Sequence, residues 1–176
     1  MNSHFTKIFG VCSLRINKKS CEPYKLIPKM NLSQYVLKKN GVPIGHPNSL
    51  RNNLARSIGA KNFHTFWTYW NPIFSYYLGT KVFRPLKRIF PVLIALMLTF
   101  VFCGFIHDLV TTLIRGKISL YFTVWFFLMS IFVVISKKWN YNLSQKHFLI
   151  RASANMLIIF SCFFITKYLN LLVNFY

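Results

Sequence analysis

Two ionisable residues stand side by side inside an apolar run of the chain. His107 and Asp108 lie within residues 91–114, where Asp108 is the only charged side chain. Ionisable groups at membrane depth cost about 2.5 to 3.5 kcal/mol, so they usually face a protein interior or a water-filled cavity. Burial disfavours the charged form of an imidazole. We therefore expect His107 to be neutral near pH 7 and able to act as a general base.

The residues around this pair allow more than one interpretation. Gly104, one helical turn before His107, leaves room for a substrate or for the close approach of another helix. Asp108 points about 100° away from His107 on a helix, so the two do not form a catalytic dyad. They can instead be a polar pair that helps helices to associate. Cys103 shares a helix face with His107, but two ligands do not make a metal site, so we expect no bound metal.

Three long apolar runs must position these residues. Residues 91–114 would form a helix about 36 Å long, which exceeds the roughly 30 Å of bilayer hydrocarbon. Residues 118–136 and 152–175 form the second and third runs, and Lys167 lies near enough to the end of the third to reach an interface. The sequence therefore predicts an all-α membrane protein with about three transmembrane helices.

The segment before these runs predicts amphipathic or interfacial helices over residues 49–83. A short basic helix would begin after Asn48 or Ser49, either of which could be its N-cap, and stop at Gly59. Aromatic residues recur at helical spacing beyond it, which is typical of a belt at the membrane interface. Pro72 disfavours α geometry at Asn71, so we expect a kink or helix junction there.

Charge divides the chain and predicts its orientation. The sequence has 22 Lys and Arg against 2 Asp and Glu, a net charge of +20, with 54% hydrophobic residues, which excludes a disordered basic tail for most of its length. We expect residues 1–46 to be a basic cytoplasmic segment and residues 47–176 to be the membrane domain. The basic residues of the short loops predict a cytoplasmic N-terminus and an external C-terminus. Nucleic-acid binding fits the charge, but no recognition motif accompanies it, so we do not expect it.

Two stretches of the sequence together resemble the membrane-bound O-acyltransferases, the MBOAT family. They are NFHTFWTYWNPIFSYYLGTKVFRPLKR and, shortly after it, LTFVFCGFIHDL. Members of the family have an FWxxWN-type block, an aromatic and basic segment with a PL pair, and an apolar helix that carries a histidine shortly after a glycine. The matching residues here are Phe66, Trp67, Trp70, Asn71, Arg84, Pro85, Leu86, Gly104 and His107.

The resemblance implies transfer of an acyl group from a thioester donor, usually acyl-CoA, to an acceptor hydroxyl, with no further cofactor. His107 would match the catalytic histidine, and Asn71 would match a second catalytic position that orients donor or acceptor. Trp67, Trp70, Gly104 and Asp108 would bind substrate or support the site.

Family members are at least twice as long and enclose the histidine in a many-helix bundle. A short member or fragment of the family would therefore act as a homo-oligomer or with a partner membrane protein. We expect membrane lipids as further partners and a bacterial inner membrane as the location. The alternative is a non-catalytic membrane scaffold, or an MBOAT remnant, that binds anionic lipids through its basic N-terminal half.

Overall fold

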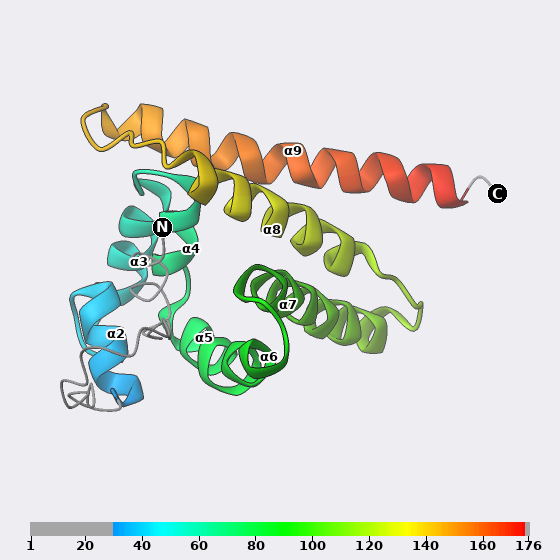
Figure 1. Cartoon of the computed structure of the whole chain (residues 1–176), viewed down its shortest axis with the longest axis horizontal. Helices are drawn as coiled ribbons and strands as arrows, with labels where there is room; N and C mark the ends of the chain where they lie inside the picture. The colour runs from blue at the N-terminus through cyan, green and yellow to red at the C-terminus, as the bar shows by residue number, and fades with distance from the viewer. Residues whose placement is uncertain (1–29, 175–176) are drawn as a thin grey trace, which may run out of the picture.

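The structure is a computed structural model that describes residues 30–174, with side chains to residue 172. Most of the predicted basic segment 1–46 and the last two residues therefore lie outside the described part. All regular elements in residues 30–174 are helical, and their order is shown in Figure 1. The elements are α2 (Leu32–Asn40), α3 (Ser49–Ile58), α4 (Phe63–Tyr69), α5 (Pro72–Tyr77), the π-helix η1 (Leu78–Phe83), α6 (Arg84–Ile89), α7 (Val92–Arg115), α8 (Tyr121–Trp139) and α9 (Phe148–Asn174).

Three of these helices are long and apolar enough to cross a membrane. They are Val92–Arg115, Tyr121–Trp139 and Phe148–Leu172, with mean hydropathies of 2.2, 1.5 and 2.0. The predicted all-α membrane protein with three spans is confirmed. α8 and α9 run side by side in Figure 1. The Tyr121 hydroxyl donates to the carbonyl of Phe163, and Trp125 Nε1 donates to that of Ile159, each at 3.3 Å.

The ends of the spans differ by a few residues from the apolar runs, because local caps decide where each helix stops. α7 ends at Gly116, whose φ of 66° is left-handed and whose N–H donates to Thr112. α8 begins at Tyr121, three residues after the start of its apolar run, and ends before Asn140, which is also left-handed with a φ of 47°. α9 begins four residues before its run, at Phe148.

The short helices α2, α3 and α4 gather at one end of the three long helices (Figure 1). Polar contacts with α9 hold this group in place. Asn155, which is buried in α9, donates through Nδ2 to the carbonyls of Ile58 and Ala60 at 3.0 and 2.9 Å. Gly59 allows this approach, because a Cβ there would lie 2.5 Å from the ring of Phe148. The predicted end of the short basic helix at Gly59 is confirmed.

The aromatic segment packs into the protein core at its beginning and becomes exposed further along. Phe63 and Phe66 are fully buried, whereas Trp70 and Tyr77 remain exposed. Trp67 lies edge-on to Phe100 of α7, with 5.0 Å between ring centroids. The segment is therefore more than the predicted aromatic belt at the membrane interface, because its first part packs α4 against the long helices.

Candidate functional site

Asn71 lies at the junction between two short helices, as its position before a proline predicts. α4 ends at Tyr69, and α5 begins at Pro72. The backbone of Asn71 is left-handed, with φ 40° and ψ 75°, a conformation that asparagine tolerates better than most residues. Its Oδ1 accepts the N–H of Phe74 at 3.2 Å and so caps α5. The predicted helix junction is confirmed.

His107 lies past the midpoint of α7 and has aromatic neighbours on several sides. Its ring stacks on Phe126, with 5.4 Å between centroids and 21° between planes. Phe122 and Phe74 lie 5.6 and 6.5 Å away. Within the described residues, neither imidazole nitrogen has a hydrogen-bond partner, so both remain available to a bound molecule.

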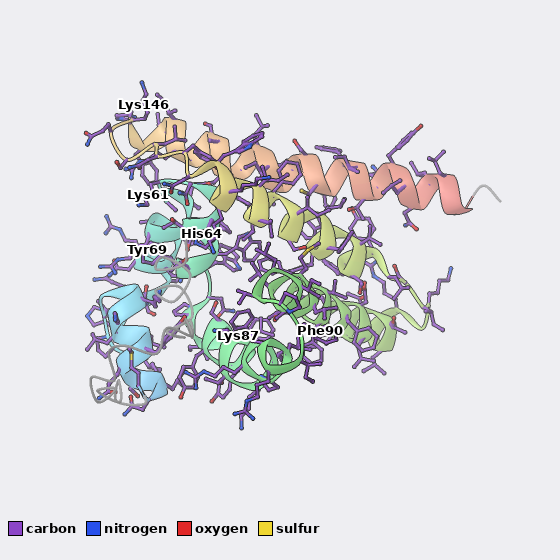
Figure 2. The ribbon with its side chains drawn as sticks, in the orientation of Figure 1. Lys61, His64, Tyr69, Lys87, Phe90 and Lys146 are labelled. Carbon is purple, nitrogen blue, oxygen red and sulfur yellow. The ribbon has the colours of Figure 1, made fainter. Side chains whose placement is uncertain are left out.

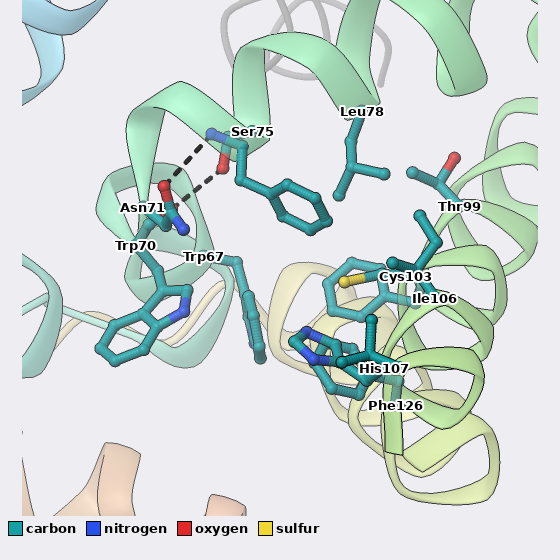
Figure 3. Close-up of a pocket in the computed structure, with 13 residues that line it drawn as sticks. Trp67, Trp70, Asn71, Ser75, Leu78, Thr99, Cys103, Ile106, His107 and Phe126 are labelled. Carbon is teal, nitrogen blue, oxygen red and sulfur yellow. Dashed lines mark hydrogen bonds between the residues drawn. The ribbon is translucent and has the colours of Figure 1, made fainter. Parts of the chain in front are cut away.

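A cavity of about 550 Å³ brings Asn71 and His107 into one site. Figure 3 shows Trp67, Trp70 and Asn71 on one side of it and His107 on the other. Aromatic and aliphatic side chains make up most of its wall. The lining residues are Trp67, Trp70, Asn71, Phe74, Ser75, Leu78, Thr99, Phe100, Cys103, Ile106, His107, Val110 and Phe126.

The cavity wall also contains an unsatisfied hydrogen-bond donor. Nε1 of Trp67 is buried and has no partner within the described residues. An indole N–H donates only, so it needs an acceptor to offset its loss of water. A carbonyl oxygen of a bound molecule is an acceptor of the right kind.

His107 is exposed in the chain, so our expectation that it is buried was wrong. The cavity is open, and the rings that contact His107 leave part of its side chain uncovered. The position of a residue along an apolar helix does not by itself decide whether its side chain is buried. Burial also requires a second helix to cover the face on which that side chain lies.

Gly104 and Asp108 do not line the cavity and face α8 instead. A Cβ on Gly104 would lie 2.6 Å from the carbonyl oxygen of Phe122 and 2.7 Å from Cα of Thr123. The buried Asp108 carboxylate accepts the N–H groups of Phe122 and Thr123 at 2.9 and 2.7 Å. Of the two interpretations of Gly104, the structure shows the close helix approach.

Two aromatic wall residues were missed by our reading of the sequence. Phe126 stacks on His107 from α8, and Phe100 meets Trp67 from α7. No pattern in the sequence marks either of them as a site residue among the 19 phenylalanines of the chain. Their positions depend on how α7 and α8 align, and only the tertiary structure shows this. Within residues 30–174, no group of three or more His, Cys, Asp or Glu side chains could hold a metal ion.

Basic side chains surround the start of α4, away from the cavity. Figure 2 shows Lys61, His64 and Tyr69 together at this end of the molecule. Burial, with the nearby charges of Lys137, Lys39 and Lys61, lowers the pKa of His64 to about 4. Lys39 lies over the rings of Tyr35 and Tyr69, and its burial lowers its pKa to about 8.

Comparison of the chain with family models, with curated protein sequences and with solved structures finds no match.

Proposed function

We propose that this protein is a membrane-embedded acyltransferase that moves an acyl group from a thioester donor, such as acyl-CoA, to an acceptor hydroxyl. The observation that carries the proposal is the shared cavity of His107 and Asn71. Asn71 lies at the junction of α4 and α5 and His107 lies in α7, so the fold brings together two residues that are far apart in the sequence. The resemblance of their two motifs to the MBOAT family supports the same chemistry.

The proposed reaction uses the imidazole as a general base and then as a general acid. His107 takes the proton of the acceptor hydroxyl as its oxygen attacks the thioester carbonyl. The tetrahedral intermediate collapses, the carbon–sulfur bond breaks, and the leaving thiolate receives the proton from His107. The product is an ester and a free thiol.

In this scheme, two neutral groups of residues that line the cavity would bind the carbonyl. The Asn71 side chain uses Oδ1 to cap α5 and keeps its amide N–H groups as donors. The buried Nε1–H of Trp67 is a second donor. Donors aimed at a developing oxyanion in a site with little water lower the barrier, and losing one typically costs about a hundredfold or more in rate.

The cavity volume and its apolar lining suit part of an acyl chain, and the open wall at His107 suits completion by another molecule. We propose a second copy of this chain or a partner membrane protein for that role. We also propose a cytoplasmic N-terminus and a bacterial inner membrane as the location.

The test compares cells that express wild type, His107→Gln or His147→Gln at matched membrane levels. Untargeted mass spectrometry of lipids, glycans and small metabolites would detect the added mass of an acyl group. We expect this signal with wild type and with His147→Gln, which changes an exposed loop histidine. We expect at least about a hundredfold less with His107→Gln. An unchanged signal with His107→Gln would exclude it as the base.

Asn71→Gly gives an independent arm of the experiment. Glycine accepts the left-handed backbone and costs only a few tenths of a kcal/mol as a helix cap, so the fold should persist. The variant still removes the amide from the cavity. We expect the acyl signal to fall while membrane levels stay unchanged, and retention of full activity would remove Asn71 from the mechanism.

The second candidate is a non-catalytic scaffold that binds anionic lipids through its basic N-terminal half. It is favoured by the scarcity of acidic groups, since Asp108 is the only one in residues 30–174. A scaffold would show identical metabolite profiles for wild type and His107→Gln. It would lose its lipid binding only when the basic residues are neutralised.

A further inference from the structure

A second groove lies on another face of α7. Its volume is about 540 Å³, and it separates η1 and α6 from α7 and the start of α8. Leu98, Val101, Phe102 and Phe105 recur at i, i+3, i+4 and i+7, so they form one face of the helix. The residues that line the cavity of His107 are on a different face, so the two sites are separate.

The walls of this groove are apolar apart from two residues. Val82, Pro85 and Leu86 face the α7 residues across it. Within residues 30–174, the exposed Lys81 is the only charged residue that lines the groove. The other polar residue is Thr123, whose hydroxyl is buried and has no partner in the described part of the chain.

Positive charge continues from Lys81 of η1 into α6. Arg84, Lys87 and Arg88 follow within two turns. Asp108 cannot neutralise them, because it is buried and its oxygens accept two N–H groups of α8. The groove therefore has a cluster of basic side chains beside it, with no acidic side chain of residues 30–174 placed to neutralise them.

We propose that this groove binds one anionic phospholipid, with an acyl chain along the Leu98–Phe105 face and its phosphate beside Lys81. The apolar walls shield the acyl chain of the bound lipid from other lipids. The basic residues of η1 and α6 favour a head group with net negative charge. The site is independent of the acyl-transfer proposal, because its ligand binds on another face of α7.

Native mass spectrometry of the full chain in detergent tests this site. The protein is mixed with equal amounts of phosphatidylglycerol and phosphatidylcholine that carry the same acyl chains. We expect wild type to retain one phosphatidylglycerol at least about fivefold more often than phosphatidylcholine. Lys81→Gln should abolish this preference without reducing the retention of phosphatidylcholine. Lys117→Gln, a change of an exposed lysine in the α7–α8 loop, should keep it.

Val101→Trp fills the groove and should reduce the retention of both lipids. If this variant does not fold, Lys81→Gln decides the question, because it changes an exposed side chain. Equal preferences in Lys81→Gln and Lys117→Gln would show that general surface charge retains the lipid and would overturn the proposal. Retention by a folded Val101→Trp at the wild-type level would do the same. Neither result depends on whether acyl transfer is detected.

Discussion

His107 and Asp108 are neighbours in the sequence, yet they contribute to different features of the molecule. The imidazole lines the cavity, while the carboxylate caps the first turn of α8. A carboxylate at a helix N-terminus also gains from the helix dipole. This explains how an acidic side chain persists in an apolar helix although no basic side chain of the described residues pairs with it.

Asp108→Ala should destabilise the folded protein by about 2–4 kcal/mol, because it leaves two N–H groups of α8 without their acceptors. Asp108→Asn should cost less, since its carbonyl oxygen still accepts one of them. Thermal unfolding in detergent micelles measures both. Thr111→Val is the matched control, because the Thr111 hydroxyl donates only to carbonyls of its own helix. Equal stability of Asp108→Ala and Thr111→Val would contradict the capping role.

Acid should destabilise the fold through His64. Its pKa is about 4 in the folded chain, below the usual 6.5, because of burial and the charges of Lys137, Lys39 and Lys61. Between these two values the unfolded chain binds more protons, so stability is lost as the pH falls from 6.5 towards 4. The unfolding midpoint of wild type should fall over this range, and that of His64→Gln should fall less. His147→Gln serves as the control, and a parallel fall in all three proteins would refute the assignment.

At the scale of elements, the contact between α7 and α8 determines the geometry of the cavity. Gly104 lets the backbones approach, and Asp108, one turn later on the same face, binds the start of α8. This alignment places Phe126 against His107. Through this contact Gly104 and Asp108, which do not line the cavity, help to position a side chain that does.

Gly104→Ala should force α7 and α8 apart, because the added Cβ would meet backbone atoms of Phe122 and Thr123. Overpacking of this kind typically costs about 1–3 kcal/mol. We expect a lower unfolding midpoint and, because Phe126 moves with α8, a weaker acyl-transfer signal. Leu109→Phe adds volume at an exposed position of α7 and should leave both unchanged. A Gly104→Ala protein as stable as wild type would show that the helices can separate at no cost.

For the whole molecule, three spans put the two ends of the membrane domain on opposite sides of the bilayer. Both the α8–α9 loop and the helices before α7 then lie on the side of the N-terminus. These parts carry most of the basic residues, whereas the α7–α8 loop has Arg115 and Lys117 near it. The distribution favours a cytoplasmic N-terminus.

Cysteine labelling of intact cells tests this orientation. In a chain whose four native cysteines are replaced, Ile118→Cys places a thiol in the α7–α8 loop, and Ser144→Cys places one in the α8–α9 loop. A membrane-impermeant maleimide should label Ile118→Cys in intact cells and Ser144→Cys only after permeabilisation. The reverse pattern would invert the orientation, and labelling of both would contradict three spans.

The sequence by itself determined the three spans, the helix junction at Asn71 and the helix end at Gly59. Each of these features is local. The apolar length of a run decides whether a helix can cross a membrane, and a proline or glycine restricts or frees the backbone beside it. No knowledge of distant neighbours is needed for such predictions.

Only the tertiary structure decided which residues share the cavity and which hold the helices together. Gly104, His107 and Asp108 lie within a stretch of five residues of one helix, and their roles differ because different neighbours face them. The alignment of α7 with α8 makes Phe126 a lining residue of the cavity and turns Gly104 towards α8 instead. That alignment depends on a close backbone approach and on hydrogen bonds between residues 14 and 15 positions apart, which no local pattern specifies.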